Sequence, residues 1–174
     1  NAAIQFSDSV TVTPLSNSAM TAFSGCVTMS DNNGNLLFYS NGYYVWNKNH
    51  QIMSGGTISQ NSPPTTASTS FQNLISLPMP DNDSLYYLIK GSEFIAGGNG
   101  STSNYRIINM NKNNGLGEVI TPSDLSMNNL VGTGISAISH QNQKDFWIIL
   151  TNKNILYAYL LSNLGIASTP IVSD

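Results

Sequence analysis

Short apolar segments alternate with clusters of turn-forming residues along this chain, most clearly over residues 25–53. Alternation of this kind predicts β-strands joined by tight turns. Asn41-Gly42 predicts a two-residue type I′ hairpin turn, because both central residues of that turn need positive φ. The strands expected in this first unit are 25–30, 36–40, 43–47 and a fourth that begins at 51–53.

The same plan of four strands recurs twice further along the chain. The second unit has expected strands at 73–79, 85–90, 104–110 and 118–121. The third has expected strands at 134–139, 145–151, 155–161 and 166–172. Two more strands, 2–6 and 9–13, precede the first unit, and loops are expected at 54–70 and 91–103.

Four strands in each repeat of about 40–60 residues are typical of a β-propeller blade. The segments 146–150 and 155–161 are apolar on both alternating faces, whereas a sheet with one wet face alternates apolar with polar residues. We therefore expect an all-β fold, a β-propeller of four-stranded WD40- or kelch-like blades, with a β-sandwich as the alternative. The expected parts are the end of a closing blade at 1–16 and blades at 25–60, 71–125 and 131–174, about three and a half blades of an incomplete ring.

An incomplete ring leaves apolar blade faces exposed, because closed propellers need about 4–8 blades. We expect the chain to continue past Asp174, or other chains to cover the open side. A start at Asn1 without Met fits a processed protein or a piece of a longer one.

Charged residues make up only 9% of the chain, and Asn, Ser, Thr and Gly supply most of its polarity. The net charge is −3 and the six Lys and Arg are spread singly, so no basic patch collects phosphates and nucleic acid is not expected as a partner. We recognise no signal peptide, and the apolar runs are far shorter than the roughly 18 residues that a spanning helix needs. The single cysteine, Cys26, lies in an apolar segment and is expected to be a buried structural thiol.

A set of short motifs runs through the three units. In the first unit they are Gly25-Cys26-Val27, Ser30-Asp31, residues 33–39 (NGNLLFY) and residues 45–53 (VWNKNHQIM), and later ones are 114–117 (NGLG), His140 before 144–147 (KDFW) and 157–161 (YAYLL). Together they resemble the N-terminal propeller of large surface proteins from gliding, type IX-secreting bacteria of the Bacteroidetes type. Those proteins often end in a gliding-motility-type C-terminal sorting domain, and the resemblance covers nearly the whole chain.

The resemblance implies a propeller of about seven blades in a protein that is exported to the cell surface or the medium. It implies that residues 2–13 are the last strands of a closing blade, which would pair with C-terminal strands. The family's role is inferred as adhesion or protein interaction, and the resemblance implies no catalytic residues.

Two turns carry oxygen ligands in the manner of the start of a calcium loop. Asp31, Asn33 and Asn35 form the first turn, and Asp81, Asn82 and Asp83 form the second. No bidentate Glu follows the first at the expected distance, so a plain hairpin turn is the competing interpretation for both. No other cofactor or metal is predicted.

Two kinds of residue in the turns and strands have a functional and a structural interpretation. His50 and His140 lack Cys-x-x-Cys or His-x-x-x-His partners, so turn hydrogen bonding is favoured over zinc binding or catalysis. The aromatic residues that could stack on sugars, with blade packing as the alternative for both tryptophans, are Tyr43, Tyr44, Trp46 and Trp147.

Two short patterns in the chain resemble motifs of other proteins. Ser9 and Ser84 stand in Asp-Ser-apolar triplets that resemble the O-glycosylation sites of secreted proteins from this bacterial group. The Gly55-Gly56 and Gly97-Gly98 doublets resemble those of kelch repeats, but loop flexibility explains them as well.

No coherent catalytic set emerges, and a Gly-x-Ser-x-Gly elbow is absent from the sequence. We therefore expect a non-catalytic binding, adhesion or assembly module of a secreted or cell-surface protein. Its expected partners are other protein chains, further blades of the same protein, or surface glycans. One alternative is a polysaccharide hydrolase with its site at a central channel, and another is a structural subunit or secretion passenger packed against other chains.

Overall fold

The computed structural model describes residues 3–6, 11–22, 25–58, 72–92, 103–120, 125–126, 134–152 and 154–173. Over these ranges the chain is all-β, with strands, turns and the short 3-10 segment Asn113–Gly115. Nowhere in them is a helix long and apolar enough to cross a membrane. Ser9, Gly97-Gly98 and most of the predicted loops lie outside the described residues.

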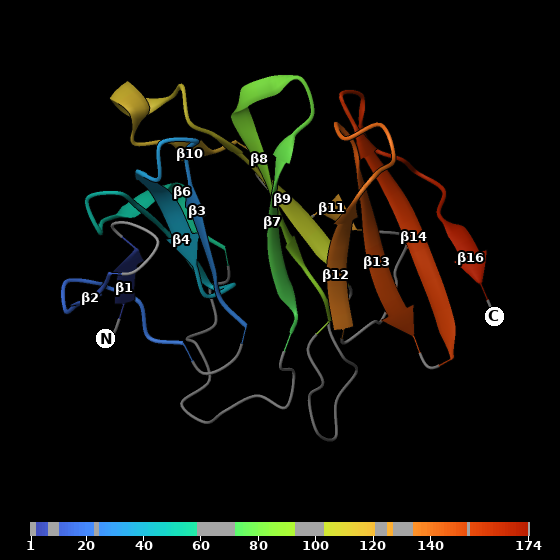
Figure 1. Cartoon of the computed structure of the whole chain (residues 1–174), viewed down its shortest axis with the longest axis horizontal. Coiled ribbons are helices and arrows are strands. Elements are labelled where there is room, and N and C mark those ends of the chain that lie inside the picture. Colours follow the sequence, from blue (N-terminus) through green and yellow to red (C-terminus); the bar gives the residue numbers. More distant parts are fainter. Residues whose placement is uncertain are drawn as a thin grey trace.

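The first of three similar units is a four-stranded antiparallel meander, as the alternating pattern predicts (Figure 1). Its strands are β3 (Val27–Ser30), β4 (Leu36–Ser40), β5 (Tyr44–Asn47) and β6 (Ile52–Thr57). Gly55 and Gly56 lie inside β6, so this doublet belongs to a strand and the interpretation as a flexible loop is wrong.

The second unit repeats the meander. Its strands are β7 (Leu74–Met79), β8 (Asn82–Lys90), β9 (Asn104–Asn109) and β10 (Glu118–Val119), and the short β11 (Leu125–Ser126) also pairs with β9. β8 begins at Asn82, before the expected start at residue 85, because a bulge lets Met79 pair with that residue.

The third unit begins with β12 (Gly134–Ser139), β13 (Phe146–Asn152) and β14 (Ile155–Ser162), in good agreement with the sequence. The single strand predicted at 166–172 is wrong. Two short strands, β15 (Gly165–Ile166) and β16 (Ile171–Ser173), pair separately with β14. Pro170 lies between them and has no N–H to donate to a continuous ladder.

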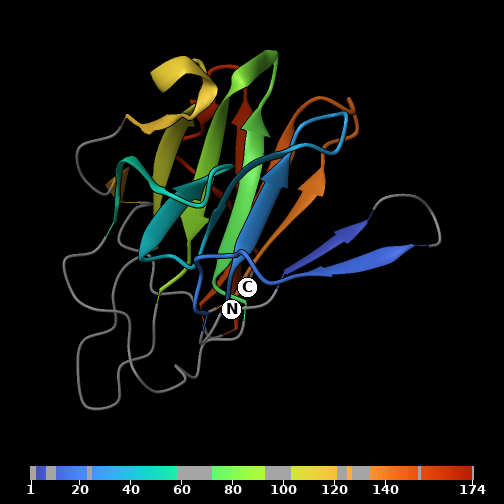
Figure 2. The same ribbon diagram turned by 90° about the vertical axis from the view of Figure 1, so that its left-hand side faces the viewer.

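The three units stand side by side like the leaves of a fan, with the N-terminus at one end of the row and the C-terminus at the other (Figure 1). The first strands β3, β7 and β12 contact one another in series, and they lie on the same side of the stack in Figure 2. Backbone contacts fix their starts, because Ile135 N–H donates to Gln72 O at 3.1 Å. A Cβ added at Gly25 would lie 2.5 Å from Asn73 Oδ1 and 3.2 Å from Asn73 N, so a larger residue here would require the Asn73 side chain to move.

The fourth strands of units one and two are also joined. β6 pairs in parallel with β10, so the first two units form one nine-stranded sheet, with the order β3-β4-β5-β6-β10-β9-β8-β7 and β11 beside β9. Since β3 and β7 at the two ends of this order are in contact, the sheet nearly closes on itself.

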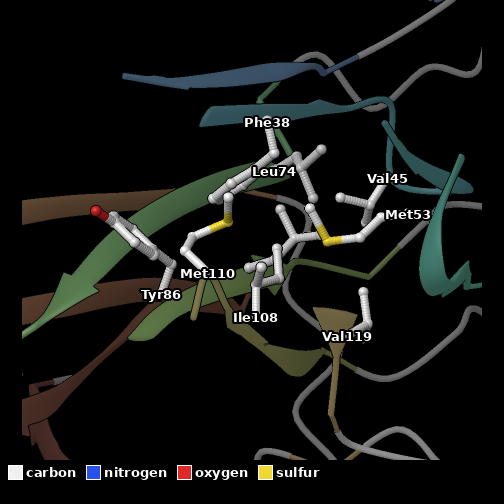
Figure 3. Packing of buried hydrophobic residues seen from close by; sticks show 9 residues of the cluster. Phe38, Val45, Met53, Leu74, Tyr86, Ile108, Met110 and Val119 are labelled. Carbon is white, nitrogen blue, oxygen red and sulfur yellow. The ribbon is translucent and has the colours of Figure 1, made fainter. Parts of the chain in front are cut away.

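Two hydrophobic cores lie between the units. The first core, between units one and two, contains Phe38, Val45, Met53, Leu74, Tyr86, Leu88, Ile108, Met110 and Val119 (Figure 3). The second core, between units two and three, contains Leu77, Tyr87, Ile89, Ile135, Ile148, Leu150, Tyr159 and Leu161. Unit two therefore has apolar side chains buried on both faces, which accounts for its lack of apolar–polar alternation.

The turn after β4 differs from the predicted two-residue type I′ turn. Gly42 has a φ of +80°, but Asn41 is not among the described residues with positive φ. Four residues, 41–44, separate the paired Ser40 and Val45, and the last of them, Tyr44, already belongs to β5 through its pairing with Thr57. Asn41 Oδ1 accepts hydrogen bonds from the backbone N–H groups of Tyr43 and Tyr44, so the asparagine side chain replaces the second positive-φ residue.

Cys26 is exposed, so the prediction of a buried thiol is wrong. Val27 and Met29 pack against the first core, and alternation along β3 then directs residues 26 and 28 to its opposite face.

Candidate functional site

Strand β8 shows how a unit of this protein packs between two neighbours. Tyr86 and Leu88 point into the first core, whereas Tyr87 and Ile89 point into the second. Burial raises the pKa of Tyr87, and the phenol of Tyr105 beside it adds to the effect. A unit in the middle of the row thus needs an apolar neighbour on each face.

Unit three has the same pattern of apolar residues on both faces, but among the described residues it has only one neighbouring unit. Phe146, Ile148 and Leu150 of β13 face the second core. The intervening positions of β12, β13, β14 and β16 face away from unit two, and the strand register aligns them across the sheet. We call this surface the open face, and its apolar residues are Ile138, Trp147, Ile149, Leu156, Ala158, Leu160 and Ile171.

The open face is uncharged and partly exposed. None of its seven residues belongs to either core. Ile138, Leu156 and Ile171 are 57%, 47% and 63% exposed, respectively. Strands β12, β13, β14 and β16 contain no Asp, Glu, Lys or Arg. Apolar surface of this kind, contiguous across several strands, is characteristic of protein interaction sites.

The corresponding outer face of unit one is covered by the chain itself. Tyr39 stacks on Trp46 with ring centroids 5.4 Å apart, and both side chains are buried. Ala19 N–H donates to Tyr39 Oη at 3.1 Å, and Asn41 Nδ2 donates to Thr21 O at 3.0 Å. The segment 18–21 therefore caps this end of the row, and the open face of unit three is the uncapped end.

In the first calcium candidate, the residues that would bind the ion form hydrogen bonds with one another. Asp31 Oδ1 accepts hydrogen bonds from the N–H groups of Asn33 and Asn35 at 2.9 and 2.8 Å, and Asn35 Nδ2 donates to Asp31 Oδ2 at 3.0 Å. These hydrogen bonds lower the pKa of Asp31, and the one from the Asn35 side chain has the largest effect. The arrangement is that of a hairpin turn closed by its own aspartate.

The second candidate turn is built differently. Asp81 forms an ion pair with Lys144 at 3.5 Å, which links the first turns of units two and three. Asp83 O accepts a hydrogen bond from Tyr86 Oη at 3.3 Å. Burial raises the pKa of Tyr86, and the negative charges of Asp83 and Asp31 add to the rise. In the described ranges, no group of three or more His, Cys, Asp or Glu residues is arranged to hold a metal ion.

Calcium is expected to leave the melting temperature unchanged, because the Asp31 carboxylate already accepts three hydrogen bonds and Asp81 is paired with Lys144. The measurement is thermal unfolding in millimolar calcium and in EDTA, with Asp31→Asn as the control. A melting temperature that rises with calcium in the wild type but not in the control would establish Asp31 as a ligand.

The lowered pKa of Asp31 predicts an acid-dependent contribution to stability. The folded state favours the ionised carboxylate, so the contribution is present above the ordinary pKa of about 3.8 and is lost as the pH falls through the lower folded value. Asp31→Asn keeps an acceptor for the two backbone N–H groups but does not titrate. The wild type should melt higher than the variant at pH 6, and the gap should shrink below pH 4. A gap that is independent of pH contradicts this role.

The ring of His140 takes part in turn hydrogen bonding, as the sequence predicts, because its Nδ1 accepts from Asn142 N–H at 3.2 Å. In the turn at His50 the backbone N–H donates to Asn47 O at 2.9 Å, whereas the ring Nδ1 lies 3.0 Å from Tyr39 Oη of β4. Lys90 Nζ lies 4.5 Å from the centroid of the Tyr43 ring, a cation–π contact. Trp147 packs beside His140, with ring centroids 5.6 Å apart.

The glycosylation candidate Ser84 lies at the start of β8, half-buried, and its hydroxyl donates to Asn82 Oδ1 at 2.9 Å. Glycosylation of Ser84 stays a prediction. The intact mass of the native protein tests it. An added hexose mass would support it.

The open face was only partly foreseen from the sequence. The doubly apolar segments 146–150 and 155–161 predicted a second covered face, but Ile138 and Ile171 were not singled out. The register of β12 and β16 against the longer strands brings these two residues onto the same surface. The sequence shows which positions are apolar, but it does not show how the strands pair.

Comparisons with protein-family models, with curated proteins and with solved structures yield no match for this chain.

Proposed function

We propose that the chain forms three consecutive blades of a β-propeller. Three four-stranded meanders with contacting first strands, and two separate cores between them, support radial stacking. A sandwich would have one core between two layers. An experimental structure in which β3, β7 and β12 are not neighbours would overturn the proposal.

We propose further that the protein is a non-catalytic assembly module, which binds protein through the open face. The observation that carries this function is the repetition, on unit three, of the apolar pattern that unit two buries against both neighbours. Because no charged residue lies on its strands, binding an apolar partner there desolvates no charge.

The resemblance to surface proteins of type IX-secreting bacteria supports a location outside the cell, and we propose export on that ground. Cell fractionation with an antibody to the chain tests the location. Protein found only in the cytoplasm would contradict export without affecting the assembly function.

Sedimentation velocity over about 1–100 µM tests the assembly function. The wild type is expected to associate, and Ile138→Asp on the open face is expected to remain monomeric. Ser139→Asp is the matched control, because it is exposed and adjacent on β12 but lies on the other face. A glycan array and a hydrolysis screen are run in parallel. A monomeric wild type, or hydrolysis of a glycan, would overturn the proposal.

A further inference from the structure

A second uncovered apolar surface lies at the N-terminal end of the chain. Strands β1 (Ala3–Phe6) and β2 (Val12–Leu15) form a two-stranded antiparallel sheet that pairs with no other strand in the described ranges. Figure 2 shows this hairpin reaching away from the three units. A two-stranded hairpin is marginally stable in water and needs a surface to pack against.

One face of the hairpin is apolar. Phe6 pairs with Val12, and Ile4 pairs with Pro14, which places these four residues on the same face. Ile4, Phe6 and Val12 are 61%, 70% and 52% exposed. The opposite face carries the polar pair of Gln5 and Thr13 and, at the open end of the hairpin, the half-buried pair of Ala3 and Leu15. The hairpin therefore has a defined apolar side that contains no charged residue.

The hairpin and the open face lie at opposite ends of the row of units, so one copy of the chain cannot bring them together in this arrangement (Figure 1). We propose that the apolar side of the β1–β2 hairpin of one copy packs on the open face of unit three of a second copy. This inference rests on the proposed assembly function and names the partner.

The sizes of the two surfaces suit such an interface. Each of their half-exposed to two-thirds-exposed large side chains carries on the order of 100 Å² of accessible apolar surface. When two copies bind head to tail, a closed ring contains two such contacts, and the total approaches the lower part of the range of about 1,200–2,000 Å² found for specific complexes. Each contact joins two different surfaces, so two copies that make both contacts form a closed twofold-symmetric dimer, whereas copies that make one contact each with successive neighbours form a larger ring or a filament.

Sedimentation velocity of single variants and of their mixture tests the pairing. Phe6→Asp on the hairpin and Ile138→Asp on the open face should each weaken association at least tenfold, because each places a carboxylate in the apolar interface. Gln5→Asp and Ser139→Asp, on the opposite faces of the same strands, should associate like the wild type. An equal mixture of Phe6→Asp and Ile138→Asp should associate one to one more tightly than either variant alone, because one of its two contacts joins an intact hairpin to an intact open face.

Disulfide trapping identifies the contact directly. In a Cys26→Ser background, chains with Phe6→Cys should form disulfide-linked dimers with chains carrying Ile138→Cys on mild oxidation. If Ile138→Asp prevents association but Phe6→Asp does not, another occupant covers the open face, and the hairpin proposal fails while the assembly function stands. If neither substitution changes association, both proposals fail.

Discussion

Ile89→Ala is expected to lower the free energy of unfolding by about 2–5 kcal/mol, the usual cost of truncating a buried Leu or Ile. Ile89 is fully buried in the second core. Its neighbour Leu88 is 2% exposed, but it points into the first core. Leu88→Ala should therefore cost a similar amount through a different set of contacts. Urea unfolding followed by circular dichroism measures both.

The double variant, Leu88→Ala with Ile89→Ala, tests whether the units pack through two separate cores or through a single one. Because the two side chains lie on opposite faces of β8, their losses should add approximately, to about 4–10 kcal/mol. A domain has about 5–15 kcal/mol of stability in total, so the double variant should lose its cooperative transition. Ile52→Ala, at a position that is 51% exposed, should cost about 1 kcal/mol or less. If Ile89→Ala costs no more than this control, the second core does not hold unit three in place.

The strand order within each unit could be predicted from the sequence because it depends on local signals. Leu36–Ser40 and Gly134–Ser139 were predicted to the residue, since turn residues bound both segments. The turn at Asn41 and the break at Pro170 were missed, because a side-chain hydrogen bond and a missing N–H donor decide them. Apolar pattern alone does not contain that information.

Strand pairing and packing between the units could be predicted less well from the sequence. The parallel pairing of β6 with β10 joins residues that are 64 positions apart, as the Ser54–Glu118 hydrogen bond shows. No local pattern encodes such a pairing. The open face was likewise foreseeable as a class of surface but not as a set of residues, since its composition depends on register across β12 to β16. The calcium candidates could be named from spacing, but only the structure shows Asn35 donating to Asp31.

Gly55→Ala is expected to be among the most damaging single substitutions, because two costs coincide at this position. Gly55 has a φ of +68°, where an L side chain is strained by about 1–2 kcal/mol. A Cβ there would also lie 2.5 Å from the carbonyl oxygen of Val119, a backbone atom on the neighbouring β10. Relief of that clash requires β6 and β10 to move apart, which weakens the join between units one and two. The total loss should be about 3 kcal/mol or more.

Gly34→Ala is the matched control for this prediction. Gly34 has a φ of +81°, but an added Cβ meets no atom within 4 Å. Its substitution should therefore cost only the conformational strain of about 1–2 kcal/mol. The difference between the two variants in urea unfolding then measures the close approach of β6 to β10, separately from the backbone conformation. Equal losses would mean that a Cβ at position 55 is accommodated without moving β6 away from β10.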